Sequence, residues 1–152
     1  VVDPVPRPAG PAEVSAAELD DVIALRGVLE PGAAWAAAGR TLAPEERDVL
    51  WARHEAAAVA DGEDYRRLDT LLHLTIAELA GIPSLVPLVA DNRARVNAWL
   101  DTFPLLPRNI DHSTAQHAAI VSAILAGRPD AAHAAMRDHL AGSEALLRGF
   151  LA

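Results

Sequence analysis

The sequence contains no cysteine, which excludes disulfide bonds and metal sites built on thiolates. Aromatic residues make up only 4% of the chain, while alanine and leucine dominate, and this composition favours helices over sheets. The net charge of −8 argues against a surface that binds nucleic acid or an anionic membrane directly. No apolar run reaches the length that spans a bilayer, and no secretory signal is visible. The 152 residues suffice for one helical domain with a sizeable core.

Prolines and glycines divide the chain into segments. Residues 1–14 hold four prolines and are predicted to be an extended interdomain linker, so that the folded domain covers residues 15–152. Ser15 and Glu18 have the spacing of a capping box and predict the start of the first helix. Pro31 predicts a break or kink, after which a short alanine-rich helix would run to Gly39.

Helical patterns continue to the end of the chain, and no strand-like alternation of useful length interrupts them. The sequence therefore predicts an all-α, antiparallel bundle of six or seven helices. The remaining boundaries are a helix from Thr41–Glu45 to Asp61–Gly62, one from Asp64 to Ala80 capped by Gly81, one opened by Pro83 with an irregular first turn at Pro87, one ending at Gly127, and one from Pro129 with a possible interruption at Gly142.

Asp69 and His73 lie four residues apart in one predicted helix, so both side chains project from the same face, roughly 6 Å apart. His117 and His139 lie on apolar stripes of two later helices, where core-facing ligands of a bundle are expected. Three imidazoles and one carboxylate that converge from three helices would bind a first-row metal ion. The alternatives are a helix-stabilising Asp–His pair and two ordinary core histidines with hydrogen-bond partners.

The other histidines and the hydroxyl residues offer no second site. His54 and His133 are predicted to be exposed, and His112 is predicted to lie in a loop or at a helix start. The sequence lacks paired Glu-x-x-His motifs, a His-Glu-x-x-His motif, a nucleophile elbow and a glycine-rich phosphate loop.

Several pieces of the chain together resemble the FCD effector-binding domain of the FadR subfamily of GntR transcriptional regulators. These pieces are Arg26-Gly-Val-Leu29-Glu30, Asp69-x-x-x-His73, Ala80-Gly81, Gln116-His117-Ala-Ala-Ile120 and Ala-Ala-Met136-Arg-Asp-His139-Leu140. The chain departs from the family pattern at Leu72, Ile82 and Gln116, none of which is a predicted ligand.

The resemblance implies a metal- and effector-binding domain of a cytoplasmic, dimeric regulator that binds DNA through an N-terminal winged helix-turn-helix, a part this chain does not contain. Asp69, His73, His117 and His139 would be the metal ligands. An N₃O ligand set fits Zn²⁺ or Ni²⁺, with Mn²⁺ or Fe²⁺ also possible.

The implied effector is a small carboxylic acid, and Arg26 is the main candidate to bind it as a bidentate donor. Asn92, Arg93 and Arg95 are weaker candidates, because arginines two positions apart cannot share a helix face and one of them should face solvent. The alternatives are a metal-dependent hydrolase or hydratase in a helical bundle, and a dimerisation module with incidental histidines.

Overall fold

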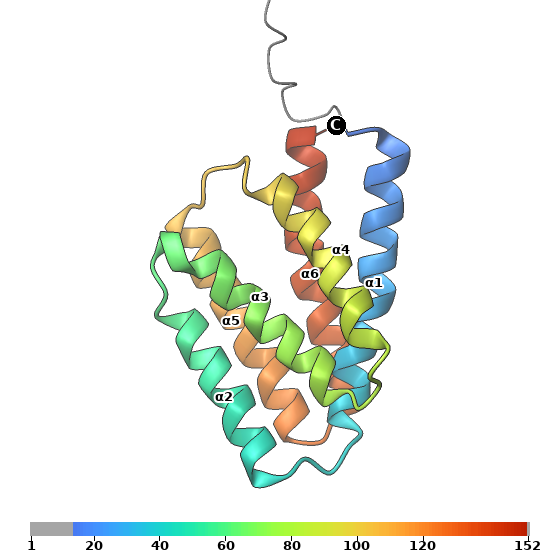
Figure 1. The fold of residues 1–152 in the computed structure, drawn as a ribbon. Coiled ribbons are helices and arrows are strands. Elements are labelled where there is room, and N and C mark those ends of the chain that lie inside the picture. The colour runs from blue at the N-terminus through green and yellow to red at the C-terminus, as the bar shows by residue number, and fades with distance from the viewer. Residues whose placement is uncertain (1–13, 152) are drawn as a thin grey trace, which may run out of the picture.

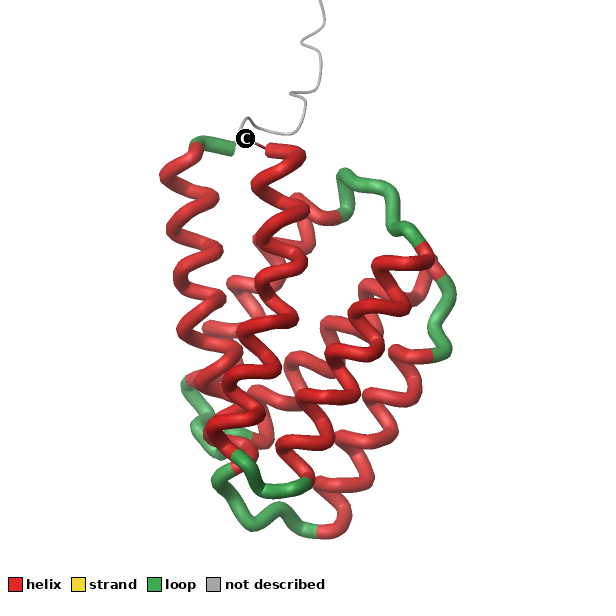
Figure 2. Tube along the Cα trace, turned by 180° about the vertical axis from the view of Figure 1, so that it is seen from behind, coloured by secondary structure: helices red, strands yellow, loops and turns green. Residues whose placement is uncertain are grey.

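The computed structural model describes residues 14–151, and within this range the chain is all-α, with six helices and no strand (Figure 1). The helices are α1 (Ala16–Ala38), α2 (Pro44–Ala58), α3 (Gly62–Leu79), α4 (Leu85–Leu100), α5 (Pro107–Leu125) and α6 (Pro129–Leu151). Consecutive helices run in opposite directions, and the connections between them lie at the two ends of the bundle (Figure 2). The predicted antiparallel bundle is confirmed. None of these helices is long and apolar enough to cross a lipid bilayer.

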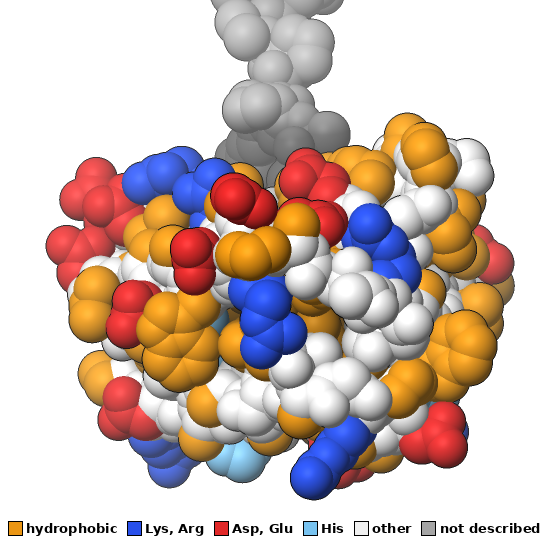
Figure 3. Space-filling model, turned by 90° about the horizontal axis from the view of Figure 1, so that it is seen from below, with side chains coloured by type: hydrophobic (Ala, Val, Ile, Leu, Met, Phe, Trp, Pro, Cys, Tyr) orange, Lys and Arg blue, Asp and Glu red, His pale blue; other side chains and the backbone are white. Residues whose placement is uncertain are grey.

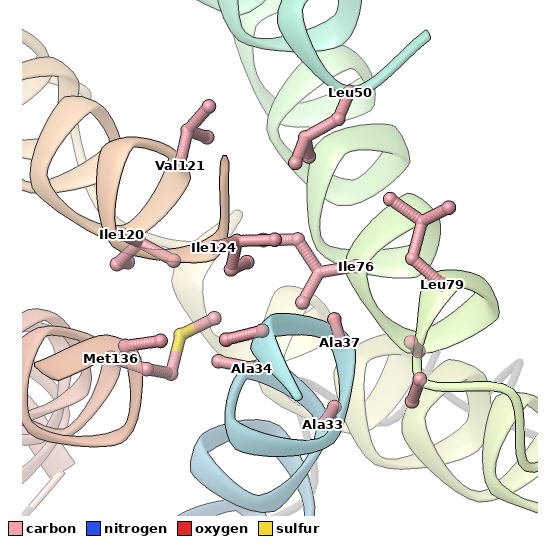
Figure 4. Close-up of a cluster of buried hydrophobic side chains, with 14 of the residues drawn as sticks. Ala33, Ala34, Ala37, Leu50, Ile76, Leu79, Ile120, Val121, Ile124 and Met136 are labelled. Atoms are coloured by element: carbon pink, nitrogen blue, oxygen red, sulfur yellow. The ribbon is translucent and has the colours of Figure 1, made fainter. Parts of the chain in front are cut away.

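Two apolar clusters hold the helices together. The larger one joins the second half of α1 to α2, α3, α5 and α6, with Leu50, Ile76, Ile120 and Met136 among its buried side chains (Figure 4). The smaller one lies where α1 begins and α6 ends, and contains Leu19, Val22, Val96, Leu100 and Leu147. Between these clusters α1, α3, α4, α5 and α6 each carry polar side chains that are buried, and this polar layer holds the candidate site.

α1 shows where local pattern and structure disagree. The prediction that Pro31 separates the first helix from a short second one is wrong, because α1 continues to Ala38 with Pro31 buried inside it. A proline in a helix loses one backbone hydrogen bond. Packing of α1 on α3, α4, α5 and α6 outweighs that loss, since most helical stability in proteins comes from a packed face.

The helix ends follow the sequence more closely. Ser15 caps α1 by accepting a hydrogen bond from the Glu18 N–H at 3.1 Å, and Gly81 ends α3 with φ of 73°. Pro83 lies in the turn before α4 rather than opening it, and α6 runs through Gly142 without interruption. The predicted linker, apart from residue 14, lies outside the described residues.

The surface mixes its charges. On the end face in Figure 3, acidic, basic and apolar side chains are interspersed, with no area of a single sign.

Candidate metal centre

Four buried side chains from three helices converge in the polar layer. α3 contributes Asp69 and His73, α5 contributes His117, and α6 contributes His139. One ligand atom from each lies within 4.8 Å of the other three. The structure therefore brings together all four residues that the sequence singled out. Their role as ligands stays a prediction.

The spacing of the donor atoms suits a bound ion. His117 Nε2 lies 3.2 Å from His73 Nε2 and 3.1 Å from His139 Nε2. Asp69 Oδ1 lies 3.1 Å from His117 Nε2 and 3.4 Å from His73 Nε2. Ligands bound about 2.1 Å from one ion at ordinary angles would be separated by roughly 3.0–3.4 Å. These four separations are thus in the range expected for ligands of a single first-row metal ion.

Hydrogen bonds on the outer side of two imidazoles fix which nitrogen faces inward. His73 Nδ1 lies 2.6 Å from a Glu30 oxygen, and His139 Nδ1 lies 2.8 Å from the side-chain oxygen of Gln116. Because these oxygens accept hydrogen bonds, each Nδ1 carries the proton and each Nε2 directs a lone pair inward. Two such lone pairs and the Asp69 carboxylate around one point fit a cation, since they would otherwise repel one another.

A buried network of charges surrounds the ligands. Arg93 donates to Asp69 Oδ2 at 2.7 Å and to Glu30 Oε1 at 3.3 Å. Arg26 donates from Nε to Glu30 Oε2 at 2.7 Å. The two carboxylates and two guanidiniums balance in charge, so a divalent ion bound to neutral histidines would leave the site with an excess of positive charge. Such a site favours an anionic ligand.

The pKa values of the two acids follow from the same network. Burial would raise the pKa of Asp69, but Arg93 and His73 outweigh it and hold that pKa well below its usual range. Burial would likewise raise the pKa of Glu30, but its hydrogen bond with His73 and its ion pairs with Arg26 and Arg93 hold that pKa well below its usual range. Both acids are therefore ionised.

Two of the histidines are held neutral. Burial, followed by the neighbouring imidazoles of His73 and His117, lowers the pKa of His139 to about 2. Burial likewise lowers the pKa of His117. A metal ion binds the neutral imidazole, so these shifts favour the form that acts as a ligand.

A cavity of about 510 Å³ opens beside Asp69 and His139. Arg26 lies in its wall and donates from Nη1 to Ser143 at 2.7 Å. Its hydrogen bonds to Glu30 and Ser143 use two of the five guanidinium N–H groups, so three remain without a hydrogen bond among the described residues.

The other predicted effector residues lie elsewhere. Arg93 is buried in the charge network, and Asn92 donates to the Val22 carbonyl at 3.0 Å. Arg95 is exposed and pairs with Glu18, as expected for one of two arginines spaced two apart. Among the described residues, only Arg26 of the four predicted effector contacts lines the cavity.

Sequence reasoning missed two residues that orient the ligands. Glu30 belongs to the Arg26–Glu30 piece that supported the family resemblance. Membership in that piece was the one feature of the sequence that could have indicated a role for Glu30. Gln116 was noted only as a departure from the family pattern.

His54 was predicted to be exposed, and this was wrong, because it is buried on α2 beside Trp51. His133 is half-buried rather than exposed, and His112 lies within α5 rather than in a loop.

Comparison with known proteins connects this geometry to a family. The model of the FCD domain matches residues 21–142. Two curated relatives, from Escherichia coli (strain K12) and Shigella flexneri, are both named putative L-lactate dehydrogenase operon regulatory protein. Each is 26% identical over 144 residues, which cover 86% of this chain and 52% of the relative. The chain thus spans about half the length of these relatives.

Solved structures share the fold. E. coli McbR/YncC matches with a TM-score of 0.76 and 19% identity, over 93% of this chain and 76% of that one. Streptococcus agalactiae GntR matches with a TM-score of 0.68 and 23% identity, over 88% of this chain and 62% of that one. At these identities the likeness concerns the arrangement of helices alone.

Proposed function

The chain belongs to the FCD domain family, whose members are ligand-sensing domains of transcriptional regulators and not enzymes. We propose that it senses a small carboxylic acid with the help of one divalent metal ion. The observation that carries this proposal is the convergence of Asp69, His73, His117 and His139, with imidazole lone pairs directed inward. This N₃O set suits Zn²⁺ or Ni²⁺, with Mn²⁺ or Fe²⁺ as further candidates.

A carboxylate is the ligand class that the surroundings favour. When bound, the ion would supply a positive charge that attracts the oxygens of an acidic effector, and a five- or six-coordinate ion held by Asp69, His73, His117 and His139 could also accept such oxygens as ligands. The cavity reaches Asp69 and His139, so an effector within it would lie next to the ion. Arg26 lines the same cavity, and its three remaining N–H groups can hold a carboxylate oxygen.

Effector binding could change the arrangement of the helices, because the residues that would hold the effector and the ion lie on different helices. Arg26 lies on α1, and the ligands lie on α3, α5 and α6. An effector held between Arg26 and the ion favours one arrangement of these helices over others, and this difference in affinity is what a regulator needs.

We further propose that the whole protein is a cytoplasmic homodimer of the FadR subfamily, in which a separate N-terminal domain binds DNA.

The hydrolase or hydratase alternative has less support. A metal-activated water needs a general base beside it. Among the described residues that line the cavity, Asp69 is the only carboxylate, and it is bonded to Arg93.

The test measures metal and acid binding together. We expect about one divalent ion per chain by elemental analysis. A 2-hydroxy acid should raise the melting temperature of the metal-loaded domain and leave the metal-stripped domain almost unchanged.

Arg26→Ala should retain the ion but weaken acid binding by roughly 2–3 kcal/mol, and Arg26→Lys should restore only part of the loss. Arg95→Ala is the matched control, because Arg95 pairs with Glu18 at the surface, and it should bind acid like the unmodified chain. If the acid stabilises the metal-stripped and metal-loaded domains equally, the ion has only a structural role and the proposal is wrong.

A further inference from the structure

The cavity beside the metal centre has two chemically different ends. The end at the ligands carries polar side chains, namely Arg26, Asp69, Gln116, His139 and Ser143. The other end is formed by the last turn of α4, the 101–106 connection and the last turns of α6, and its apolar side chains are Leu100, Phe103, Leu106, Leu146 and Phe150. The cavity is also lined by the polar side chains of Tyr65, Arg66, Asn109, His112 and Ser113.

The apolar end is assembled from segments that are distant in sequence. The rings of Phe103 and Phe150 stack, with centroids 4.5 Å apart and planes inclined by 26°. Phe150 is nevertheless 60% exposed, and Leu106 and Leu146 are 40% and 37% exposed. Large apolar side chains that gather around a cavity without being buried mark a surface that another apolar group covers.

The size of the cavity argues for a ligand larger than a three-carbon acid. Its volume of about 510 Å³ lies within the range of roughly 300–1,000 Å³ that is common for drug-sized ligands. A lactate-sized molecule held between Arg26 and the ligands would leave most of this volume, and all of the apolar end, without a partner.

The charges in the cavity wall also limit the ligand. At the polar end, Arg26 has N–H groups to spare. Towards the other end, Arg66 donates from Nε to Asp101 at 3.1 Å, so its charge is balanced by that carboxylate and no metal ion would add to it. A second carboxylate at the far end of the ligand would have to compete with Asp101 for Arg66. It would also lose its hydration beside the apolar Phe103 and Leu106, which is unfavourable.

We propose that the effector is an amphipathic monocarboxylic acid, whose carboxylate and 2-hydroxyl lie at the polar end and whose aliphatic chain or aromatic ring, of about six to ten carbons, fills the apolar end. This inference rests on the function proposed above and narrows its ligand class. Phe103, Leu146 and Phe150 then determine specificity, while Arg26 and the ion bind the head group.

The experiment is isothermal titration of the Zn²⁺-loaded domain with 2-hydroxypropanoate, 2-hydroxyhexanoate, 2-hydroxyoctanoate and 2-hydroxyoctanedioate. Each added methylene should raise the affinity roughly three- to fourfold until the apolar end is filled. The octanedioate has the length of the octanoate but a second carboxylate, and it should bind at least tenfold more weakly than the octanoate.

Variants separate a bound tail from general apolar adhesion. Phe150→Ser should remove most of the advantage of the octanoate over the propanoate, while the affinity for the propanoate stays unchanged. The matched control is Val59→Ser, because Val59 is 86% exposed at the end of α2 and does not line the cavity. It should bind every acid like the unmodified domain.

Different failures have different meanings. If all four acids bind with equal affinity, or if the octanedioate binds best, the amphipathic class is wrong although the proposed function stands. If the octanoate binds the metal-stripped domain as well as the metal-loaded one, adhesion to the apolar surface explains the binding, and this inference is overturned. If the domain takes up none of Zn²⁺, Ni²⁺, Mn²⁺ and Fe²⁺, the proposed function itself fails.

Discussion

At the scale of single residues, Glu30 is the most consequential side chain outside the ligand set. Its Oε1 accepts a hydrogen bond from His73 Nδ1 at 2.6 Å, and its carboxylate forms ion pairs with Arg26 and Arg93. A carboxylate behind a metal-binding imidazole fixes the ring orientation and makes the inward nitrogen more basic. We therefore propose that Glu30 positions His73 for the metal ion.

Replacing Glu30 tests this role. Glu30→Gln should weaken Zn²⁺ binding by about 10- to 100-fold, because an amide cannot supply the charge that polarises His73. Competition with a chelator of known affinity measures the loss. Glu18→Gln is the control, since Glu18 lies on the same helix in an exposed pair with Arg95. Equal Zn²⁺ affinity in the two variants would show that Glu30 does not orient the site.

The sequence predicted which side chains converge better than it predicted which side chains surround them. Asp69 and His73 share a face by spacing alone, and the apolar stripes beside His117 and His139 indicated that these side chains point inward. An Arg–Glu pair four residues apart is, by contrast, a pattern most often found on exposed helix surfaces. The burial of Glu30 depends on α3 and α4 packing over it, which no local pattern encodes.

At the scale of helices, the wrong boundaries were predicted from single prolines and glycines without regard to tertiary packing. Pro31 and Gly142 both predict interruption, yet α1 and α6 run through them. These two helices pack against each other along the bundle, so tertiary contacts determine their length. Gly81 was predicted correctly, because its role depends only on its own backbone angle.

Two glycine variants test this distinction. A Cβ at Gly27, exposed within α1, would meet nothing within 4 Å, so Gly27→Ala should stabilise the domain by about 0.5–1 kcal/mol. A Cβ at Gly81 would lie 3.0 Å from Arg40 at a φ of +73°, so Gly81→Ala should destabilise it by about 1–2 kcal/mol. Urea unfolding measures both values. Effects of the same sign would contradict this account.

At the scale of the whole molecule, the metal centre lies in a polar layer between two apolar clusters. Arg26, Glu30, Asp69, Arg93 and the three histidines are all buried there. Such a layer contributes less to folding than apolar packing would, because buried charges lose their hydration. It remains stable only while its histidines and acids keep the protonation states that their partners require.

The metal-free domain should therefore lose stability in acid. The pKa of His139 is about 2 in the folded chain and that of His117 is also lowered, while an unfolded chain titrates near 6.5. Below about pH 6.5 the unfolded state binds protons that the folded state excludes, so the free energy of unfolding falls as the pH falls. The lowered pKa values of Asp69 and Glu30 add a second loss below about pH 4, where these acids titrate in the unfolded chain.

Urea unfolding of the chelator-treated domain between pH 7.5 and 5 isolates the histidines. The free energy of unfolding should decrease by about 1–3 kcal/mol per pH unit below pH 6, the range expected for one or two groups. His139→Gln should reduce this slope, since it removes one such group. His133→Gln, a change at a half-buried position on the same helix, should keep the slope of the unmodified chain. A free energy independent of pH in this range would mean that the buried histidines gain protons without cost, and that the polar layer is open to water in solution.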